Sequence, residues 1–211
     1  MKLYTYFRSS AAFRVRIALN LKGLKYQPVF VHLAKGEHRK PEYASVNAQA
    51  LLPALELDDG TRLTQSLAIM EYLEETYARP ALLPADPLGK ARVRSLCDLI
   101  ACEIHPLNNL RTLQYLKRAL SQTEDQVNTW YRHWIADGLA KLEAELPGGK
   151  GKYSHADSPT MADCCLVPQI FNAKRYNCDL APYPNTMRVF DECMKLEAFD
   201  RAQPSKQPDA E

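Results

Sequence analysis

Hydrophobic and polar positions follow a strand period at two places in the first 32 residues and a helix period between them. Residues 2–6 alternate and are rich in aromatics, and residues 26–32 carry the run Val-Phe-Val, so both segments predict β-strands. A serine pair at positions 9–10 is placed to cap a helix that extends to about residue 22. Because Pro28 cannot donate a ladder hydrogen bond, the second strand is expected at a sheet edge.

The helix that begins at the serine pair has an apolar stripe and two arginines. Phe13, Ile17 and Leu21 recur at the helical spacing and are expected to face the core. Arg14 and Arg16 fall between them and are expected to point away from that core.

The chain then passes through a polar segment, a hairpin and another helix. Residues 33–50 are polar and are expected to be mobile. Residues 54–64 predict a strand, a tight turn at Asp58-Asp59-Gly60 and a second strand. Ser66 is expected to cap a helix that ends near residue 77. The predicted element order of this region is β-α-β-β-β-α.

Beyond a proline-rich connector at residues 79–87, only helical periods follow. The segments with this period are 89–107, 109–120, 123–146, 160–176 and 184–196. The tail, residues 203–211, is polar with two prolines and is expected to be loose. The sequence therefore predicts an α/β domain over residues 1–80 and an all-α domain over residues 88–211.

Composition and charge narrow the class of protein. The 211 residues are 46% hydrophobic and 25% charged, with a net charge of +2, which favours a globular protein and argues against nucleic-acid binding. No apolar run is long enough for a membrane span, and the first residues lack the apolar region of a signal peptide, so a cytoplasmic protein is expected. None of the six cysteines forms a C-x-x-C pair, and no metal site is predicted.

Two helix starts in the α/β domain carry candidate chemistry. Ser9 and Ser10 lie where a strand leads into a helix, and a helix N-terminus favours an anion such as a thiolate. Arg8 precedes them, where it can meet a carboxylate. Gln65 and Ser66 open the other helix, and their side chains and amides suit the head group of an α-amino acid. Each serine read alone is more typical of a simple helix cap.

In the helical region, polar residues gather around Pro106, which is expected to kink the helix. His105, Asn109 and Arg111 lie beside this kink, a pattern more typical of a site than of a core. Residues 160–163 have the pattern of a reciprocal capping box, which indicates a role in folding and not in chemistry. A lone cation at Arg175 would by itself be interpreted as a surface residue.

The order of these features resembles that of the zeta class of the cytosolic glutathione transferases. The segments that carry the resemblance are R-S-S-x-x-x-R-V-R-I-A-L at 8–19, Q-S-L-A-I at 65–69, Y-L-E-E at 72–75, L-L-P at 82–84, I-x-P-L-x-N-L at 104–110 and T-M-A-D-x-x-L-V-P-Q at 160–169. The resemblance covers nearly the whole chain. It implies a thioredoxin-like N-terminal domain, an all-α C-terminal domain and a homodimer.

The resemblance also implies an activity. The zeta class includes maleylacetoacetate isomerases, glutathione-dependent cis–trans isomerases of tyrosine breakdown, and bacterial maleylpyruvate isomerases of aromatic-acid degradation. Glutathione is then the cofactor, and a maleyl ketone that carries carboxylates is the substrate. The alternatives left open are the choice between these two isomerases, a conjugating transferase, and a non-catalytic protein on the same fold.

Roles for individual residues follow from the resemblance. The catalytic group comprises Arg8, Ser9 and Ser10, and glutathione is expected to contact Ser9, Ser10, His38, Leu52, Gln65, Ser66, His105 and Asn109. The substrate carboxylates are assigned to Arg8, Arg111 and Arg175. The chain departs from the family at Ala11 and Phe13, where members often have cysteine and tryptophan. That departure places the chemistry on the glutathione thiol and not on a protein thiol.

The energetics of thiol ionisation favour a hydroxyl donor. Reversible addition of a thiolate to the double bond requires an ionised thiol, and lowering its pKa from ~8.5 by about two units requires about 2.7 kcal/mol. A helix terminus supplies about 0.3–1 kcal/mol, and about 2 at best. A hydrogen bond to the charged sulfur supplies roughly 1.5–3 kcal/mol. Ser9 is predicted as that donor, with Ser10 assisting.

Overall fold

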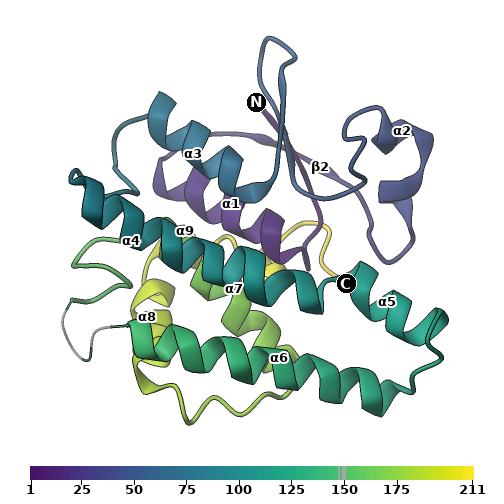
Figure 1. Ribbon diagram of the computed structural model, residues 1–211. Coiled ribbons are helices and arrows are strands. Elements are labelled where there is room, and N and C mark those ends of the chain that lie inside the picture. The colour runs from purple at the N-terminus through teal and green to yellow at the C-terminus, as the bar shows by residue number, and fades with distance from the viewer. Residues whose placement is uncertain (147, 149–150) are drawn as a thin grey trace. The chain divides into compact units, whose positions relative to one another are not determined.

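The computed structural model describes residues 1–146, 148 and 151–211, and the chain forms two compact units (Figure 1). One unit comprises Met1–Leu82 together with Met194–Glu211, and the other comprises Leu83–Cys193. The boundary between Leu82 and Leu83 lies within the predicted connector at residues 79–87. The end of the chain differs from the expected boundary, because Met194–Glu211 packs with the N-terminal segment and not with the helical one.

The first unit is built on a four-stranded sheet. Its strands are β1 (Lys2–Thr5), β2 (Gln27–Phe30), β3 (Ala54–Glu56) and β4 (Arg62–Thr64). Their order is β2-β1-β3-β4, with β1 parallel to β2 and both other pairs antiparallel. Pro28 therefore lies on an edge strand, as predicted, where its missing N–H costs no ladder bond. The hairpin predicted at residues 54–64 is β3 and β4.

The helices of this unit are α1 (Ser10–Leu21), α2 (Pro41–Ala44), α3 (Ser66–Thr76) and α9 (Glu197–Asp200). Helices α1 and α3 lie side by side (Figure 1), and α1 also contacts α9. Two features differ from the sequence analysis here. The segment 33–50, to which no element was assigned, contains the 3₁₀ turn Glu37–Arg39 and α2. Arg14 and Arg16, expected to point away from the core, are 2% and 0% exposed.

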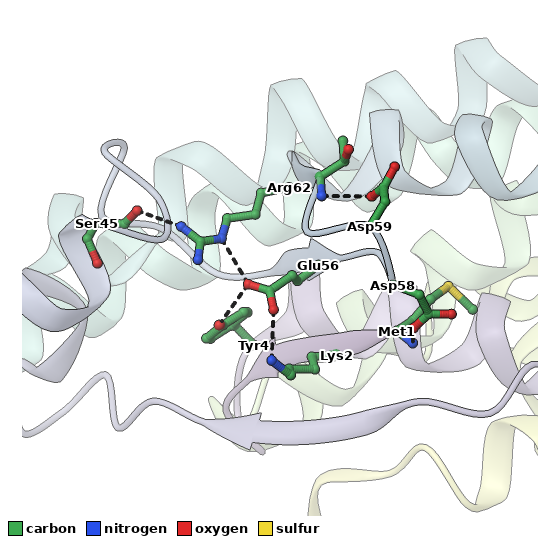
Figure 2. A network of polar contacts seen from close by, with 9 residues as sticks. Met1, Lys2, Tyr4, Ser45, Glu56, Asp58, Asp59 and Arg62 are labelled. Carbon is green, nitrogen blue, oxygen red and sulfur yellow. Dashed lines mark hydrogen bonds and ion pairs between the residues drawn. The ribbon is translucent and has the colours of Figure 1, made fainter.

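A network of polar side chains crosses the sheet (Figure 2). The Glu56 carboxylate on β3 accepts hydrogen bonds from Lys2 Nζ at 2.8 Å, Arg62 Nε at 2.9 Å and the Tyr4 hydroxyl at 3.3 Å. These donors, led by Lys2 and Arg62, lower the pKa of Glu56 from 4.5 to about 2. The network joins β1, β3 and β4 across the sheet.

The C-terminal tail is ordered on the first unit, so the expectation of a loose tail is wrong. It contains the 3₁₀ turn Pro204–Lys206, and Gln207 Nε2 donates to the carbonyls of Arg201 and Gln203, each at 2.9 Å. Asp209 and Glu211 bond to the N-terminal segment, through Phe7 N at 2.9 Å and His32 Nε2 at 2.9 Å. Long-range polar contacts order a segment whose composition is typical of a free end.

The second unit is helical, as predicted. Its elements are α4 (Pro87–Asp98), a π-helical segment (Leu99–Ile104), a 3₁₀ turn (His105–Asn108), α5 (Leu110–Arg118), α6 (Glu124–Glu145), α7 (Met161–Arg175) and α8 (Pro184–Met194). The predicted helix 89–107 is thus three consecutive helical pieces. Pro106 has no N–H and so cannot make the regular helical hydrogen bond. The helix is therefore irregular at the predicted kink.

The capping box predicted at Thr160 and Asp163 is confirmed. Asp163 Oδ2 accepts from Thr160 N at 2.7 Å and from Thr160 Oγ1 at 2.9 Å, and its Oδ1 accepts from Ser154 N at 2.8 Å. The Asp163 side chain is fully buried. Burial raises the pKa of Asp163, while these three donors oppose that rise.

Three observations concern classes of site. Within the described part of the chain, every helix is too short or too polar to cross a bilayer. Across the same residues, no three His, Cys, Asp or Glu side chains are grouped so as to hold a metal ion. The six cysteines, all of them in the described ranges, form no disulfide.

Candidate functional site

The connection from β1 to α1 places the serine pair at a helix N-terminus. Ser9 is the N-cap of α1, and its Oγ accepts a hydrogen bond from Ala12 N at 3.2 Å. Ser10 is the first helical residue, and both serines are 8% exposed. Accepting the bond from Ala12 uses a lone pair of the Ser9 oxygen and not its hydrogen, so this hydroxyl can donate to an anion in front of the helix. The structure therefore brings a hydroxyl donor and the positive end of α1 together.

Arg8 lies in the same connection but is exposed. Its guanidinium lies over the Phe7 ring, 4.8 Å from the ring centroid. The predicted neighbourhood of Arg8 and Ser9 thus holds in space, with the cation on the solvent side of the connection.

The start of α3 differs from its prediction. Ser66 is not the cap but the first helical residue, and Gln65 occupies the cap position with a positive φ of 67° and without a side-chain capping bond. The Ser66 hydroxyl accepts a hydrogen bond from Arg14 Nη1 at 3.2 Å. The Gln65 side chain donates to Gln49 Oε1 at 2.6 Å, which orients it.

Arg14 is a residue of this site that the sequence reasoning missed. It is 2% exposed, and its Nε is buried without a hydrogen-bond partner among the described residues. Its helical position between core-facing residues gave no signal of a role. The signal lies in the structure, where a buried cation on α1 bonds to the first residue of α3.

The turn at Leu52 is packed against the connection that carries Ser9. Tyr6, Phe7, Val31, Tyr43 and Leu52 form one buried apolar cluster. The Leu52–Pro53 peptide bond is cis, and the preceding Leu51 carbonyl accepts from the Tyr43 hydroxyl at 2.6 Å and from Asn47 Nδ2 at 2.8 Å. The structure thus brings the predicted Leu52 and Ser9 segments together.

His38 lies in the 3₁₀ turn Glu37–Arg39 and is 7% exposed. Burial lowers the pKa of His38, and the nearby Arg39 lowers it further, so the imidazole is neutral at pH 7. Its Nδ1 is buried without a hydrogen-bond partner among the described residues. A buried polar atom of this kind is available to a ligand.

These residues of the first unit fit a thiol tripeptide with a charged amino-acid head. The Ser66 hydroxyl, the N-terminus of α3 and the buried Arg14 charge suit a carboxylate. The Ser9 hydroxyl at the N-terminus of α1 suits a thiolate. The buried apolar cluster joins Leu52 to Tyr6 and Phe7, the residues that lead to Ser9.

The predicted residues of the second unit lie on two segments. Asn109 is the N-cap of α5, and its Oδ1 accepts from Arg111 N at 3.0 Å, so this side chain has a structural role. Arg111 is exposed in the first turn of α5, and His105 is half-buried in the 3₁₀ turn before it. Arg175 is exposed in the last turn of α7, with its guanidinium 5.0 Å from the centroid of the Tyr176 ring.

Tyr131 on α6 connects these two segments, and sequence reasoning missed it. Its carbonyl accepts from Asn108 Nδ2 at 3.4 Å, and its ring stacks on Tyr176 with centroids 3.6 Å apart. Burial raises the pKa of Tyr131 well above its usual range, although the neighbouring Arg175 opposes that rise. The phenol therefore remains neutral beside this arginine.

The comparisons with known proteins agree with this geometry. Residues 1–75 match the family described as the N-terminal domain of glutathione S-transferases. The maleylacetoacetate isomerase of Pseudomonas aeruginosa is 48% identical over 211 residues, which cover 99% of this chain and 98% of the relative. A holo structure of maleyl pyruvate isomerase, described as a bacterial glutathione S-transferase of the zeta class, matches with a TM-score of 0.97 at 47% identity, covering all of both chains. The chain belongs to the zeta class of the glutathione transferases.

A second solved structure adds ligands to the comparison. It is maleylacetoacetate isomerase from Methylobacterium extorquens AM1 with bound malonate and GSH, and it matches this zeta-class chain with a TM-score of 0.96 at 40% identity over all of both chains. The predicted family and the predicted thioredoxin-like plus all-α fold are thus confirmed.

Proposed function

We propose that this zeta-class protein converts maleylacetoacetate to fumarylacetoacetate by glutathione-dependent cis–trans isomerisation. The chain is an isomerase that uses glutathione, as its full-length relatives named maleylacetoacetate isomerase and its GSH-bound structural neighbour indicate. The observation that supports the proposal is the buried Ser9 hydroxyl at the N-cap of α1, which accepts a hydrogen bond from Ala12 N and so keeps its own hydrogen for another acceptor. We also propose that the protein is a homodimer and that it is cytoplasmic.

The bound cofactor supplies a thiolate that adds reversibly to the activated double bond and so allows rotation about it. Ser9 donates its hydrogen to the sulfur, and the N-terminus of α1 adds a favourable field. About 2.7 kcal/mol is needed to lower a thiol pKa by about two units. A charge-assisted bond of roughly 1.5–3 kcal/mol and a helix terminus of about 0.3–1 kcal/mol together supply that amount.

Other residues of the first unit hold the tripeptide in our proposal. Ser66 and Gln65 at the start of α3 bind the γ-glutamyl head, and Arg14 supplies the compensating charge. The Leu52 backbone holds the peptide next to the buried cluster. His38 contributes its unpartnered Nδ1.

In the second unit, Arg111 and Arg175 are proposed to bind the substrate carboxylates, as is Arg8 of the first unit. All three guanidiniums are exposed and suit bidentate contact with a carboxylate. They also stabilise the negative charge that develops on the substrate. His105 and Asn109 complete the cofactor contacts in this proposal.

A maleylpyruvate substrate is the second candidate, because the structural neighbour of that name covers the whole chain at 47% identity. The two substrates share the maleyl-ketone unit and differ beyond the ketone. The same arginines suit either one.

The test is an ultraviolet isomerase assay with maleylacetone and with maleylpyruvate, each with and without glutathione. Turnover that requires glutathione without consuming it is expected, and the larger kcat/KM identifies the substrate. Net glutathione consumption would instead support a conjugating transferase. Absence of turnover by a protein that still binds glutathione would refute the isomerase.

Matched serine variants test the mechanism in the same assay. Ser9→Ala is expected to lower kcat at least about tenfold, which corresponds to about 1.4 kcal/mol of lost stabilisation. Ser10→Ala, at the neighbouring position, is expected to have a smaller effect. An unchanged kcat in Ser9→Ala would remove Ser9 from the leading role.

A further inference from the structure

One buried cation donates hydrogen bonds to the connection between β1 and α1. Arg16 is 0% exposed, and its Nη1 donates to Thr5 Oγ1 at 3.1 Å and to the Tyr6 carbonyl at 3.3 Å. Its Nη2 donates to the Phe7 carbonyl at 3.1 Å. A single guanidinium thus fixes three successive residues that lead to Ser9.

The C-terminal tail completes this arrangement. Arg16 Nε donates to the Ala202 carbonyl at 3.1 Å. The Asp209 carboxylate accepts from Phe7 N at 2.9 Å, so Phe7 is bonded through its carbonyl to Arg16 and through its N–H to the tail. Ser9 N in turn donates to the Tyr6 carbonyl at 2.9 Å. The bonds run without a gap from the tail to the backbone of Ser9.

Charge provides a second reason for the contact between the tail and this connection. Burial lowers the pKa of Arg16 to about 10, and Tyr26 and then the negative charge of Asp209 oppose that shift. The other oxygen of the carboxylate, Asp209 Oδ1, is buried without a hydrogen-bond partner among the described residues. The Asp209 side chain as a whole is half-buried, and a carboxylate oxygen without a hydrogen-bond partner is less costly when a cation lies near it. The charge of Asp209 therefore offsets part of the cost of burying Arg16 next to the Ser9 connection.

We propose that Asp209 is a positioning residue for the thiol site, acting through Phe7 to hold Ser9 at the N-cap of α1. The inference rests on the proposed function of Ser9 and extends it to the end of the chain. Asp209 touches neither cofactor nor substrate in this proposal. Its role is to keep the Ser9 hydroxyl in the orientation in which it donates to the thiolate.

The variants are Asp209→Ala and Asp209→Asn, with Glu211→Gln as the matched control in the same tail. Glu211 is exposed and bonds to His32 and Lys35, so it shares the tail but not the bond to Phe7. Asp209→Asn keeps an acceptor oxygen for the Phe7 amide and guards against a folding failure of the alanine variant.

The first measurement is the ionisation of the bound glutathione thiol, followed by thiolate absorbance during a pH titration of the full-length protein. Asp209→Ala is expected to raise the thiol pKa by about one unit, a tenfold loss in the ionisation constant, and to lower kcat about tenfold. Asp209→Asn is expected to lie between the alanine variant and wild type. Glu211→Gln is expected to match wild type.

A double-mutant cycle separates positioning from general stability. If Asp209 acts through Ser9, adding Asp209→Ala to Ser9→Ala lowers kcat less than twofold further. If Asp209 only stabilises the fold, the two effects on kcat multiply, and that result would overturn the proposal.

Hydrogen exchange tests the positioning role of Asp209 independently of the proposed isomerase function. Exchange at the amides of residues 7–9 needs no substrate, and Asp209→Ala is expected to accelerate it at least tenfold relative to Glu211→Gln. Absence of isomerisation by the wild-type protein would refute the proposed function and leave this readout intact. A folded Asp209→Ala variant with wild-type exchange and wild-type thiol ionisation would refute the positioning role.

Discussion

Replacement of Asp163 by alanine tests how far one buried carboxylate stabilises the helical unit. The side chain is fully buried at the third position of α7. It accepts three hydrogen bonds, from the backbone and hydroxyl of Thr160 and from the backbone of Ser154. Asp163→Ala removes all three acceptors at once and puts no other polar group in their place.

The magnitude follows from the two backbone donors left behind. Ser154 and Thr160 are 1% and 6% exposed, so water has little access to either N–H group. A buried donor left unsatisfied costs about 1–3 kcal/mol, which gives about 2–6 kcal/mol for the pair. Relief of the desolvation of the buried Asp163 carboxylate offsets part of this cost. We therefore expect a loss of about 3 kcal/mol, or a fall in Tm of roughly 6–12 °C.

The assay is urea unfolding followed by circular dichroism, with thermal melts alongside. Asp157→Ala is the matched control, because Asp157 is exposed in the same loop and accepts one backbone hydrogen bond, from Lys152 N at 3.2 Å. Its loss is expected to cost less than about 1 kcal/mol. If Asp163→Ala destabilises no more than Asp157→Ala, the accounting of unsatisfied donors is wrong.

Three further predictions concern the first unit. The low pKa of Glu56, about 2 instead of 4.5, means that its carboxylate contributes stability above pH 4.5 that is lost as the pH falls toward 2. The difference in urea midpoint between wild type and Glu56→Gln should therefore be largest near pH 7 and close as the pH falls through that window; a constant difference would contradict the assignment. Lys22→Met removes a buried ammonium that pairs with Glu74 and is expected to lower the free energy of unfolding by about 3–5 kcal/mol. Lys25→Met, at an exposed lysine, should cost little, and equal losses for the two variants in urea titrations would count against a buried ion pair. Arg14→Gln weakens the bond to Ser66 and is expected to raise the Kd for glutathione about 10–100-fold, since a charged hydrogen bond contributes roughly 1.5–3 kcal/mol. Isothermal titration measures this Kd, and a folded variant with wild-type affinity would exclude a role of Arg14 in glutathione binding.

The sequence predicts a feature correctly where the interaction that determines it lies within a few residues. Ser9 caps α1 because its own side chain bonds to Ala12, three residues away. Pro28 lies on an edge strand because its missing N–H excludes it from a central one. The capping box at residues 160–163 likewise contains both of its partners within four residues. In each case the sequence pattern contains the interaction itself.

Three of the wrong predictions, for Ser66, the tail and Arg16, share the opposite property. Ser66 was expected to cap α3 through a local bond, but its hydroxyl bonds to Arg14, 52 residues away. The tail has the composition of a free end, but Asp209 bonds to Phe7 across 202 residues. The buried Arg16 follows the same rule, because its guanidinium is satisfied by carbonyls at both ends of the chain.

The bonds of Arg16 and Asp209 converge on the connection that leads to Ser9 for a physical reason. A segment that leaves a strand and enters a helix carries backbone groups that neither element satisfies, and a buried site cannot leave them to water. Arg16 supplies donors to the carbonyls of this connection, and Asp209 supplies an acceptor to its N–H group. A helical period predicts only that Arg16 is polar and therefore exposed. The burial of this arginine follows from the unsatisfied carbonyls around Ser9, so the residue most wrongly predicted is bonded to the segment that carries the proposed chemistry.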